Sequence, residues 1–353
     1  MKINLHRTLG SVAVLFLAVA AATANDQKRD VFVVTSTNDA AGNQALVFRL
    51  SPAGTSLTLV NTLATGGNGG ATGNAGAVQF SDSFGAVVNY GSNNLTRLER
   101  EDNGIHMAGT VSLAPDCVQP VSVALKNRQA FVLGSNCVES HSWPSGQLDG
   151  NVVSLSDASG AQIVAGQSWA AVTMKSGSVL HLSLSAGGAL TGSSTPVTLP
   201  SNANNTPLGA AFWGDILGFN PAHSPDSFAL VDRKGDVFPV LGPQPAYPSN
   251  APCWLAKGSG DIWYSGNSPG QAISIFFSDG QGGTFYKSVP VAGVPTDVTV
   301  SPDGKWLAAI YTAADGTGGR IAVFSIDRYG DLTLAVTSSP VGAAGFNGVA
   351  ISE

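Results

Sequence analysis

The stretch "PTDVTVSPDGKWLAAIY", residues 295–311, joins two short apolar runs through a Ser-Pro-Asp-Gly turn. Pro302 fixes φ for the turn, Asp303 can bond to the backbone that follows it, and Gly304 tolerates a positive φ. Alternating runs on both sides of such a turn predict a β-hairpin. The fold depends on whether this hairpin is single or repeated.

Similar hairpin starts lie near residues 76, 120, 160, 207 and 251, and a last one near residue 345 has room for a single strand. Two further strand-like runs follow each complete hairpin, and the starts are spaced by about 45 residues. Four strands per unit at this period are typical of a β-propeller blade. The sequence therefore predicts an all-β, seven-bladed β-propeller.

The two ends of the chain complement each other. "GFNGVAIS" (345–352) offers one strand, whereas residues 30–64 contain three strand-like runs that lack a first strand. Joined, they complete one blade and remove two exposed sheet edges. The alternative, a β-sandwich with chance repeats, does not explain these matching ends. We expect one propeller domain, residues 30–353, closed by its C-terminal strand.

Residues 1–24 are predicted to be a signal peptide. Lys2 and Arg7 precede an apolar run over 9–24 that is shorter than the roughly 20 residues of a membrane span, and Ala22-Thr23-Ala24 provides a small-residue cleavage site. Residues 25–29 then form a short propeptide or linker. The mature protein is expected to be secreted to the extracellular space, without a membrane span.

The chain has three cysteines, which fits one disulfide and one free thiol in an oxidising compartment. Cys117 and Cys137 are equally distant from a turn centred on Asn127, so an antiparallel hairpin would place them opposite each other, close enough to bridge. Cys253 begins an apolar run and is expected to be a buried thiol.

Composition excludes several classes of partner. Charged residues make up 11% of the chain, the net charge is −6, and the basic residues form no stripe, so nucleic acid is not expected to bind. No Cys/His cluster has metal-ligand spacing, and no cofactor is expected. Asn94 and Asn204 begin Asn-X-Thr glycosylation signals on predicted loops. We expect a monomer.

The ordered segments "TGGNGGATGNAGAVQFS", "QPVSVAL", "TPLGAAF", "APCWLA", "PTDVTVSPDGKWL" and "AGFNGVAIS" resemble successive blade starts of the seven-bladed lactonase-like propellers. That family includes proteins of the 6-phosphogluconolactonase and carboxymuconate-cyclase types. The resemblance covers residues 30–352. It implies a small lactone or carboxylate as ligand, at one end of the central channel.

The predicted ligand site lies on the face where loops enter the innermost strands, here called the entry face. Long loops over 35–44, 137–150, 220–227 and 312–320 share this face, and long loops are often functional. Polar residues at the channel entrances, together with His223, make a candidate ligand cup: Asn74, Gln119, Asn205, Asp297 and Asn347. Each could instead only satisfy backbone groups where a strand begins.

The candidate catalytic residues are His141, Glu139 and Arg320, all on predicted entry-face loops. Opening a lactone needs a base that directs water at the carbonyl carbon, a role for His141 or Glu139. It also needs a cation for the developing oxyanion, a role for Arg320. These side chains could equally be solvated loop residues.

Two functions follow. The first is a secreted lactone hydrolase or cyclase that acts on a small lactone or carboxylate at the channel. The second is a non-catalytic, secreted binding or surface-interaction glycoprotein, like an antigen or an effector. The resemblance favours an enzyme, because lactone-processing relatives use His, Glu and Arg near the channel mouth. The amides at Asn74 and Gln119 depart from that pattern and favour the second function.

Overall fold

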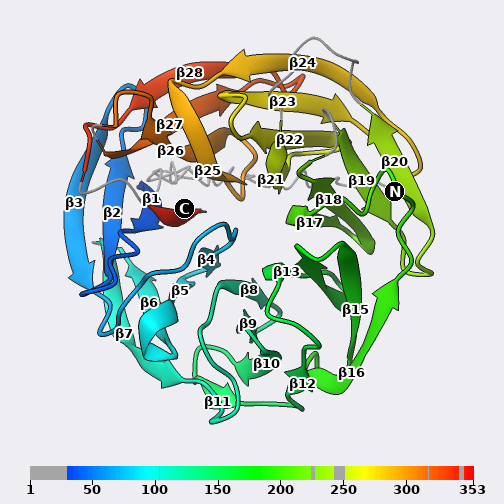
Figure 1. The fold of residues 1–353 in the computed structure, drawn as a ribbon. Coiled ribbons are helices and arrows are strands. Elements are labelled where there is room, and N and C mark those ends of the chain that lie inside the picture. The colour runs from blue at the N-terminus through cyan, green and yellow to red at the C-terminus, as the bar shows by residue number, and fades with distance from the viewer. Residues whose placement is uncertain (1–29, 103, 224–226, 242–250, 317, 342–345) are drawn as a thin grey trace, which may run out of the picture.

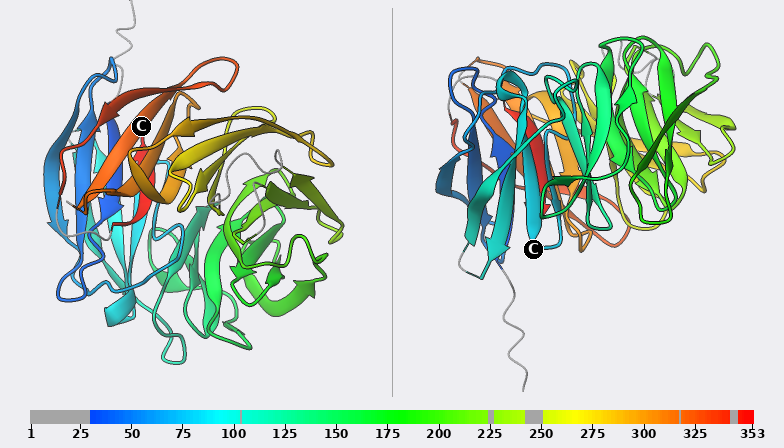
Figure 2. Two further views of the ribbon diagram at one scale, coloured as in Figure 1. Left: turned by 45° about the horizontal axis from the view of Figure 1, so that its top comes forward. Right: turned by 90° about the horizontal axis from the view of Figure 1, so that it is seen from below.

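A computed structural model describes residues 30–353 except 103, 224–226, 242–250, 317 and 342–345. Its strands form seven antiparallel sheets arranged as a ring of blades around a central axis (Figure 1). Figure 2 shows the ring from the side, with the strands crossing its thickness between two faces. We call the face of the turns between first and second strands the turn face; the entry face lies opposite.

The strands run outward from the axis in each blade. Blade 1 contains β29 (Asn347–Ser352), β1 (Val31–Ser36), β2 (Gln44–Leu50) and β3 (Leu57–Ala64). Blade 2 contains β4 (Val78–Ser81), β5 (Phe84–Asn89), β6 (Asn94–Glu101) and β7 (Gly104–Ser112), with the short helix η1 (Tyr90–Ser92) after β5. Blade 3 contains β8 (Ser122–Lys126), β9 (Gln129–Leu133), β10 (Cys137–Ser142), β11 (Gln147–Leu148) and β12 (Val153–Ser154).

The other four blades are regular. Blade 4 contains β13 (Gly160–Ala165), β14 (Trp169–Met174), β15 (Ser178–Leu184) and β16 (Leu190–Val197). Blade 5 contains β17 (Pro207–Trp213), β18 (Ile216–Pro221), β19 (Ser227–Val231) and β20 (Val237–Leu241). Blade 6 contains β21 (Pro252–Lys257), β22 (Ile262–Asn267), β23 (Ala272–Phe277) and β24 (Thr284–Pro290). Blade 7 contains β25 (Gly293–Val300), β26 (Trp306–Ala313), β27 (Gly319–Ile326) and β28 (Leu332–Thr337).

The C-terminal strand closes the ring, which confirms the prediction. β29 pairs antiparallel with β1, so that Phe32 lies opposite Ser352 and Val34 opposite Ala350. The hydroxyl of Thr35 adds a hydrogen bond of 2.7 Å to the carbonyl oxygen of Gly348. Blade 1 is thus built from both ends of the chain.

The predicted blade starts are confirmed, because each coincides with an inner strand. Two local predictions are wrong. Residues 137–142, expected within a long loop, form β10, since Glu139 and His141 pair with each other and can therefore be buried in a strand. Asn94, expected on a loop, is the first residue of β6, while Asn204 lies exposed outside the strands.

The disulfide is present between Cys117 and Cys137, whose Cα atoms are 5.4 Å apart. It ties the segment before β8 to the first residue of β10. A Cβ atom at Gly134 would lie 2.6 Å from Sγ of Cys137, so the bridge needs glycine there. Cys253 is a buried free thiol, as predicted.

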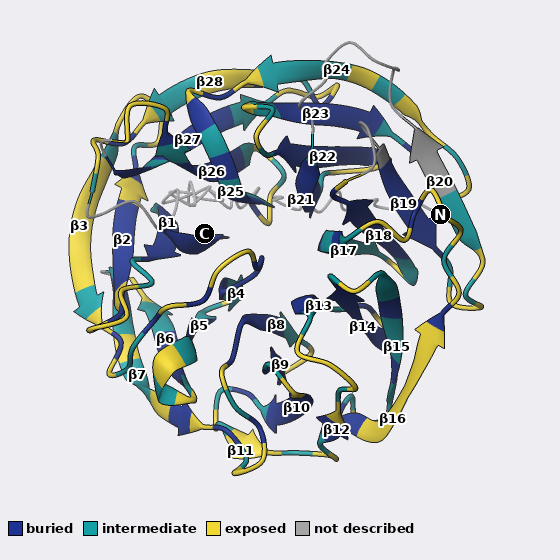
Figure 3. Cartoon of the chain, in the orientation of Figure 1, coloured by how far each residue is buried: buried dark blue, intermediate teal, exposed yellow. Residues whose placement is uncertain are grey.

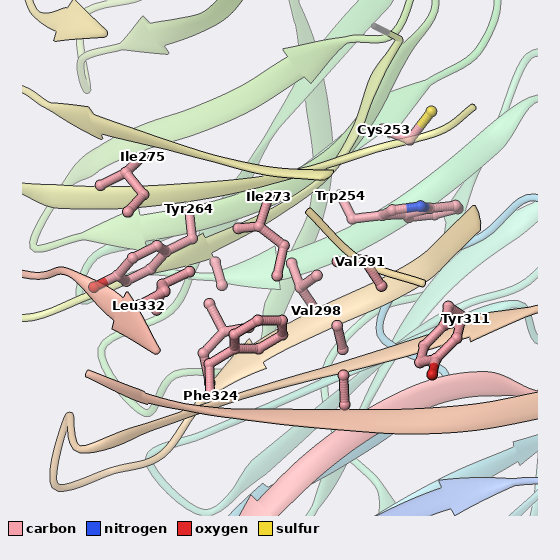
Figure 4. Packing of buried hydrophobic residues seen from close by; sticks show 14 of the residues in the cluster. Cys253, Trp254, Tyr264, Ile273, Ile275, Val291, Val298, Tyr311, Phe324 and Leu332 are labelled. Carbon is pink, nitrogen blue, oxygen red and sulfur yellow. The ribbon is translucent and has the colours of Figure 1, made fainter. Parts of the chain in front are cut away.

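The core lies between neighbouring blades. Second strands such as β9, β14 and β22 are buried along their whole length, because both faces of each sheet pack against other blades, whereas outer strands such as β3 are mostly exposed (Figure 3). Between blades 6 and 7, Trp254, Tyr264 and Phe324 belong to one apolar cluster (Figure 4). The alternation of apolar residues in the sequence therefore builds interfaces between sheets.

The outer strands carry β-bulges. Register shifts interrupt the pairing of β3, β7, β24 and β28 with their inner neighbours. A bulge bends an edge strand and hinders pairing with another sheet. In the part of the chain that the structure describes, no helix is long and apolar enough to cross a membrane.

Candidate functional site

A glycine-rich segment closes the entry face of the channel. Residues 66–77, which we call the strap, connect β3 of blade 1 to β4 of blade 2 and reach the centre of the ring (Figure 1). The side-chain amide of Asn74 donates to the carbonyl oxygens of Gly160 and Ala161, at 3.0 and 3.1 Å. The carbonyl oxygen of Gly76 accepts from the backbone N–H of Val123, at 2.9 Å. The strap therefore spans the channel as far as blades 3 and 4.

Asn38 holds the beginning of the strap against blade 1. Its Oδ1 accepts from the backbone N–H groups of Gly70 and Ala71, at 2.8 and 3.1 Å, and its Nδ2 donates to the carbonyl oxygen of Ala71. A Cβ atom at Gly69 would lie 2.3 Å from the backbone carbon of Asn38. The glycine-rich composition thus permits close backbone contact.

Beneath the strap lies a cavity of about 340 Å³ that opens toward the turn face. Its walls are the C-terminal halves of the inner strands of blades 3 to 7 and the turns that follow them, together with Gln79 of blade 2. Each of these strands ends its sheet, so one edge of its backbone faces the axis without a strand partner. Such edges present N–H and C=O groups, which makes the walls polar.

Three polar side chains gather at the closed end of the cavity. Gln79, Gln162 and Asp297 line it from blades 2, 4 and 7. A Cβ atom at Gly76 would lie 3.2 Å from Nε2 of Gln162 and 3.5 Å from Nε2 of Gln79. The backbone N–H of Gly76 donates to Oδ2 of Asp297 at 3.0 Å. Two carboxamides and one carboxyl group therefore meet beneath the strap.

Asp297 is 5% exposed. Its Oδ1 accepts from the N–H of Val298 at 2.9 Å, its Oδ2 accepts from Gly76, and the N–H of Val349 also stabilises the carboxylate. Burial disfavours the ionised form more than these donors favour it, so the pKa of Asp297 rises from 3.8 to about 7. Near neutral pH this carboxyl group can both accept and donate a proton.

Two lysines lie at the open end. Lys126 is half-buried at the end of β8 and lines the cavity. Nζ of Lys257 donates to the carbonyl oxygens of Gly258 and Gly260, at 2.8 and 2.6 Å, and lies 5.2 Å from the ring centres of Trp213 and Trp263. Burial lowers the pKa of Lys257 to about 8. Its ammonium group therefore joins blades 5 and 6.

The structure separates the predicted ligand residues into two groups. Asp297 lines the cavity, and Asn74 and Asn347 are buried on the entry-face side of the ring. Gln119 is exposed in the loop before β8. Asn205 and His223 are exposed near each other in blade 5, where Nδ2 of Asn205 donates to the carbonyl oxygen of His223 at 3.0 Å.

The predicted catalytic residues do not line the cavity. Glu139 and His141 are 0% and 1% exposed, and Oε1 of Glu139 lies 2.7 Å from Nε2 of His141. Oε2 of Glu139 accepts from the backbone N–H of Ala114 at 3.0 Å, so the pair links blade 3 to the loop before it. Arg320 is half-buried in β27, opposite Tyr311 of β26. The three residues therefore do not form one site.

Sequence reasoning missed Gln79, Gln162, Lys126 and Lys257. The signal was a polar residue inside an apolar inner strand, as in "AVQFS" (77–81) and "AQIVA" (161–165). Only the ring shows that these positions face one cavity. Among the described residues, no group of three or more His, Cys, Asp or Glu side chains could hold a metal ion.

No family model and no curated protein sequence matches the chain. Solved structures do. A provisionally assigned 6-phosphogluconolactonase of Bacteroides uniformis is 15% identical with a TM-score of 0.64, covering 91% of this chain and 99% of its own. The periplasmic gluconolactonase of Pseudomonas aeruginosa is 15% identical with a TM-score of 0.63, covering 90% and 98%.

Virginiamycin B lyase from Staphylococcus aureus is 14% identical with a TM-score of 0.56, covering 80% of this chain and 92% of its own. At these identities the similarity shows the fold alone. The chain is a seven-bladed β-propeller with the fold of the lactonase-like propellers.

Proposed function

We propose that the protein hydrolyses a small, oxygen-rich lactone in the channel cavity, with Asp297 as the general base. The observation that carries this proposal is the buried carboxyl group at the closed end of a polar cavity, beside the carboxamides of Gln79 and Gln162. Lactones and their hydroxylated acids present many oxygen atoms, which such groups recognise. The lactonase names of two similar structures agree with this ligand class.

The proposed reaction uses one water molecule. Ionised Asp297 takes a proton from the water as the water oxygen bonds to the lactone carbonyl carbon. Amide N–H groups of Gln79 and Gln162 donate to the carbonyl oxygen, which gains negative charge. The ring C–O bond then breaks, and Asp297 returns the proton to the ring oxygen. The product is the open hydroxy acid.

One observation favours the second function, binding without turnover. A carboxylate has about four acceptor positions, and in Asp297 backbone N–H groups of Gly76, Val298 and Val349 use three of them. A carboxyl group held in this way could serve mainly to fix the strap. In that case the cavity would bind a lactone or carboxylate and leave it unchanged.

Glucono-1,5-lactone hydrolysis, followed in a pH-stat above the spontaneous rate, tests the two functions. Catalysis by Asp297 predicts a rate that rises with pH and levels off above about 7, the pKa of this group. Asp297→Asn should lower kcat about 100-fold or more. Asp303→Ala, in the turn at the other end of the same hairpin, is the matched control. Equal rates for wild type and Asp297→Asn would exclude catalysis by Asp297, and calorimetry would then detect binding alone.

We also propose that the protein acts outside the cytoplasm. The Cys117–Cys137 bridge supports an oxidising compartment. The predicted signal peptide, residues 1–24, and the linker, residues 25–29, lie outside the described residues. N-terminal sequencing of the exported protein should begin near residue 25, and glycosidase treatment should reveal a glycan on exposed Asn204. Retention of residues 1–24 would contradict the export proposal.

A further inference from the structure

A second cavity lies beside the first on the turn face, between blades 3 and 4. Its volume is about 160 Å³, against 340 Å³ for the channel cavity. Lys126, Gly166 and Gln167 line both cavities, so the two share one wall. A ligand that fills the channel cavity can therefore extend sideways past Lys126 into the second one.

The second cavity, which we call the side cavity, has mixed walls. The turn between β15 and β16 contributes residues 184–188, and the turn between β8 and β9 contributes Asn127. Phe131 and Leu184 add apolar surface, while Ser168 and Ser185 add hydroxyl groups. Hydroxyl and amide groups around a small apolar patch suit a second sugar-like unit, which has polar edges and apolar C–H faces.

We propose that the natural ligand has two units, a lactone or hydroxy-acid unit in the channel cavity and a glycosyl unit in the side cavity. This inference rests on the proposed function, because it assumes that the first unit occupies the channel. Lys126 stands at the shared wall, where its ammonium group can donate hydrogen bonds to oxygen atoms of both units. The substrate class is thus a lactone derived from a disaccharide.

Calorimetry with stable product acids tests the inference. Gluconate is the one-unit probe, and cellobionate, lactobionate and maltobionate are the two-unit probes. Wild type should bind at least one two-unit acid about tenfold more tightly than gluconate. Gly187→Trp places a large ring at the side cavity, where a Cβ atom would have Ser185 Oγ at 3.7 Å as its nearest neighbour. In this variant the affinity ratio should fall to about one.

The matched control is Gly282→Trp, in the corresponding turn between β23 and β24, where a Cβ atom would meet nothing within 4 Å. This control should keep the wild-type ratio. Thermal melts check folding, and Gly187→Phe replaces the Trp variant if that variant does not fold. Gluconate binding without a two-unit preference, or a preference that survives Gly187→Trp, would overturn the two-unit inference and leave the proposed function intact. Failure of all four acids to bind would overturn both.

Discussion

The backbone N–H of Gly76 donates to Oδ2 of Asp297 over 3.0 Å, although the two residues are 221 positions apart in the chain. The bond connects the strap to the inner strand of blade 7. It closes the entry face of the channel and also places the carboxyl group at the end of the cavity. The same contact therefore determines which face of the ring a ligand can enter.

The pKa of Asp297 makes stability depend on pH. In the unfolded chain the carboxyl group loses its proton near pH 3.8, and in the folded chain near pH 7. Between these values only the folded protein retains the proton, so the free energy of unfolding falls as pH rises, by roughly 4 kcal/mol at most. Denaturant melts of wild type minus Asp297→Asn, from pH 4 to 8, should show this decline. A difference that does not vary with pH would contradict it.

The buried pair of Glu139 and His141 is expected to be structural. His141→Ala leaves the carboxyl group of Glu139 buried with only the N–H of Ala114, and should lower the free energy of unfolding by about 3 kcal/mol. Lactone hydrolysis per folded molecule should stay unchanged, because neither side chain lines the cavity. A pH-stat assay at a temperature well below the melt checks this. A large fall in kcat for the folded variant would instead support the catalytic role predicted from the sequence.

The disulfide should contribute to stability through the unfolded chain. Cys117 and Cys137 are 20 residues apart, and closing a loop of this size stabilises a protein by about 3 kcal/mol. Denaturant melts of the Cys117→Ser/Cys137→Ser double variant measure the loss. Cys253→Ser is the control, since its thiol forms no bridge. Peptide mapping without reductant would refute the assignment if Cys253 were found in the bridge.

Removal of β29 should open the ring. Deleting residues 347–353 exposes the inner edge of β1 and removes the buried residues Val349 and Ile351 from the interface with blade 7. We expect aggregation or loss of a cooperative melt, measured by size-exclusion chromatography and circular dichroism. Glu353→Gln retains the strand and should melt close to wild type. A truncated chain that stays monomeric and melts like wild type would disprove closure by this strand.

The sequence predicted the blades because their signals are local. Turns such as Ser301–Gly304 and the alternating runs beside them need no distant partner. The strap could not be predicted in this way, since Asn74 and Gly76 bond to blades 4 and 7 across the ring. Loop length on the entry face suggested the site there, but the strap fills that end of the channel.

The candidate site was predicted only in part, for a related reason. Asp297 was selected as a polar residue at a strand start, and it lines the cavity. Glu139 and His141 looked like loop residues because polar side chains are rare in a buried strand; their mutual bond, which makes burial possible, is invisible in the sequence. Gln79 and Gln162 were missed because each lies within an apolar run.

Closure of the ring by β29 has a consequence for the order of the chain. Phe32 lies opposite Ser352, and Asp30 and Glu353 line one small cavity on the turn face, so the two ends of the described chain are neighbours. A short linker could join them, and new ends could be cut at an exposed turn such as that at Gly282. Every blade would then keep its strands in covalent sequence except the one that was cut. The propeller is in this sense a circle, and the position of its first residue is a matter of synthesis more than of architecture.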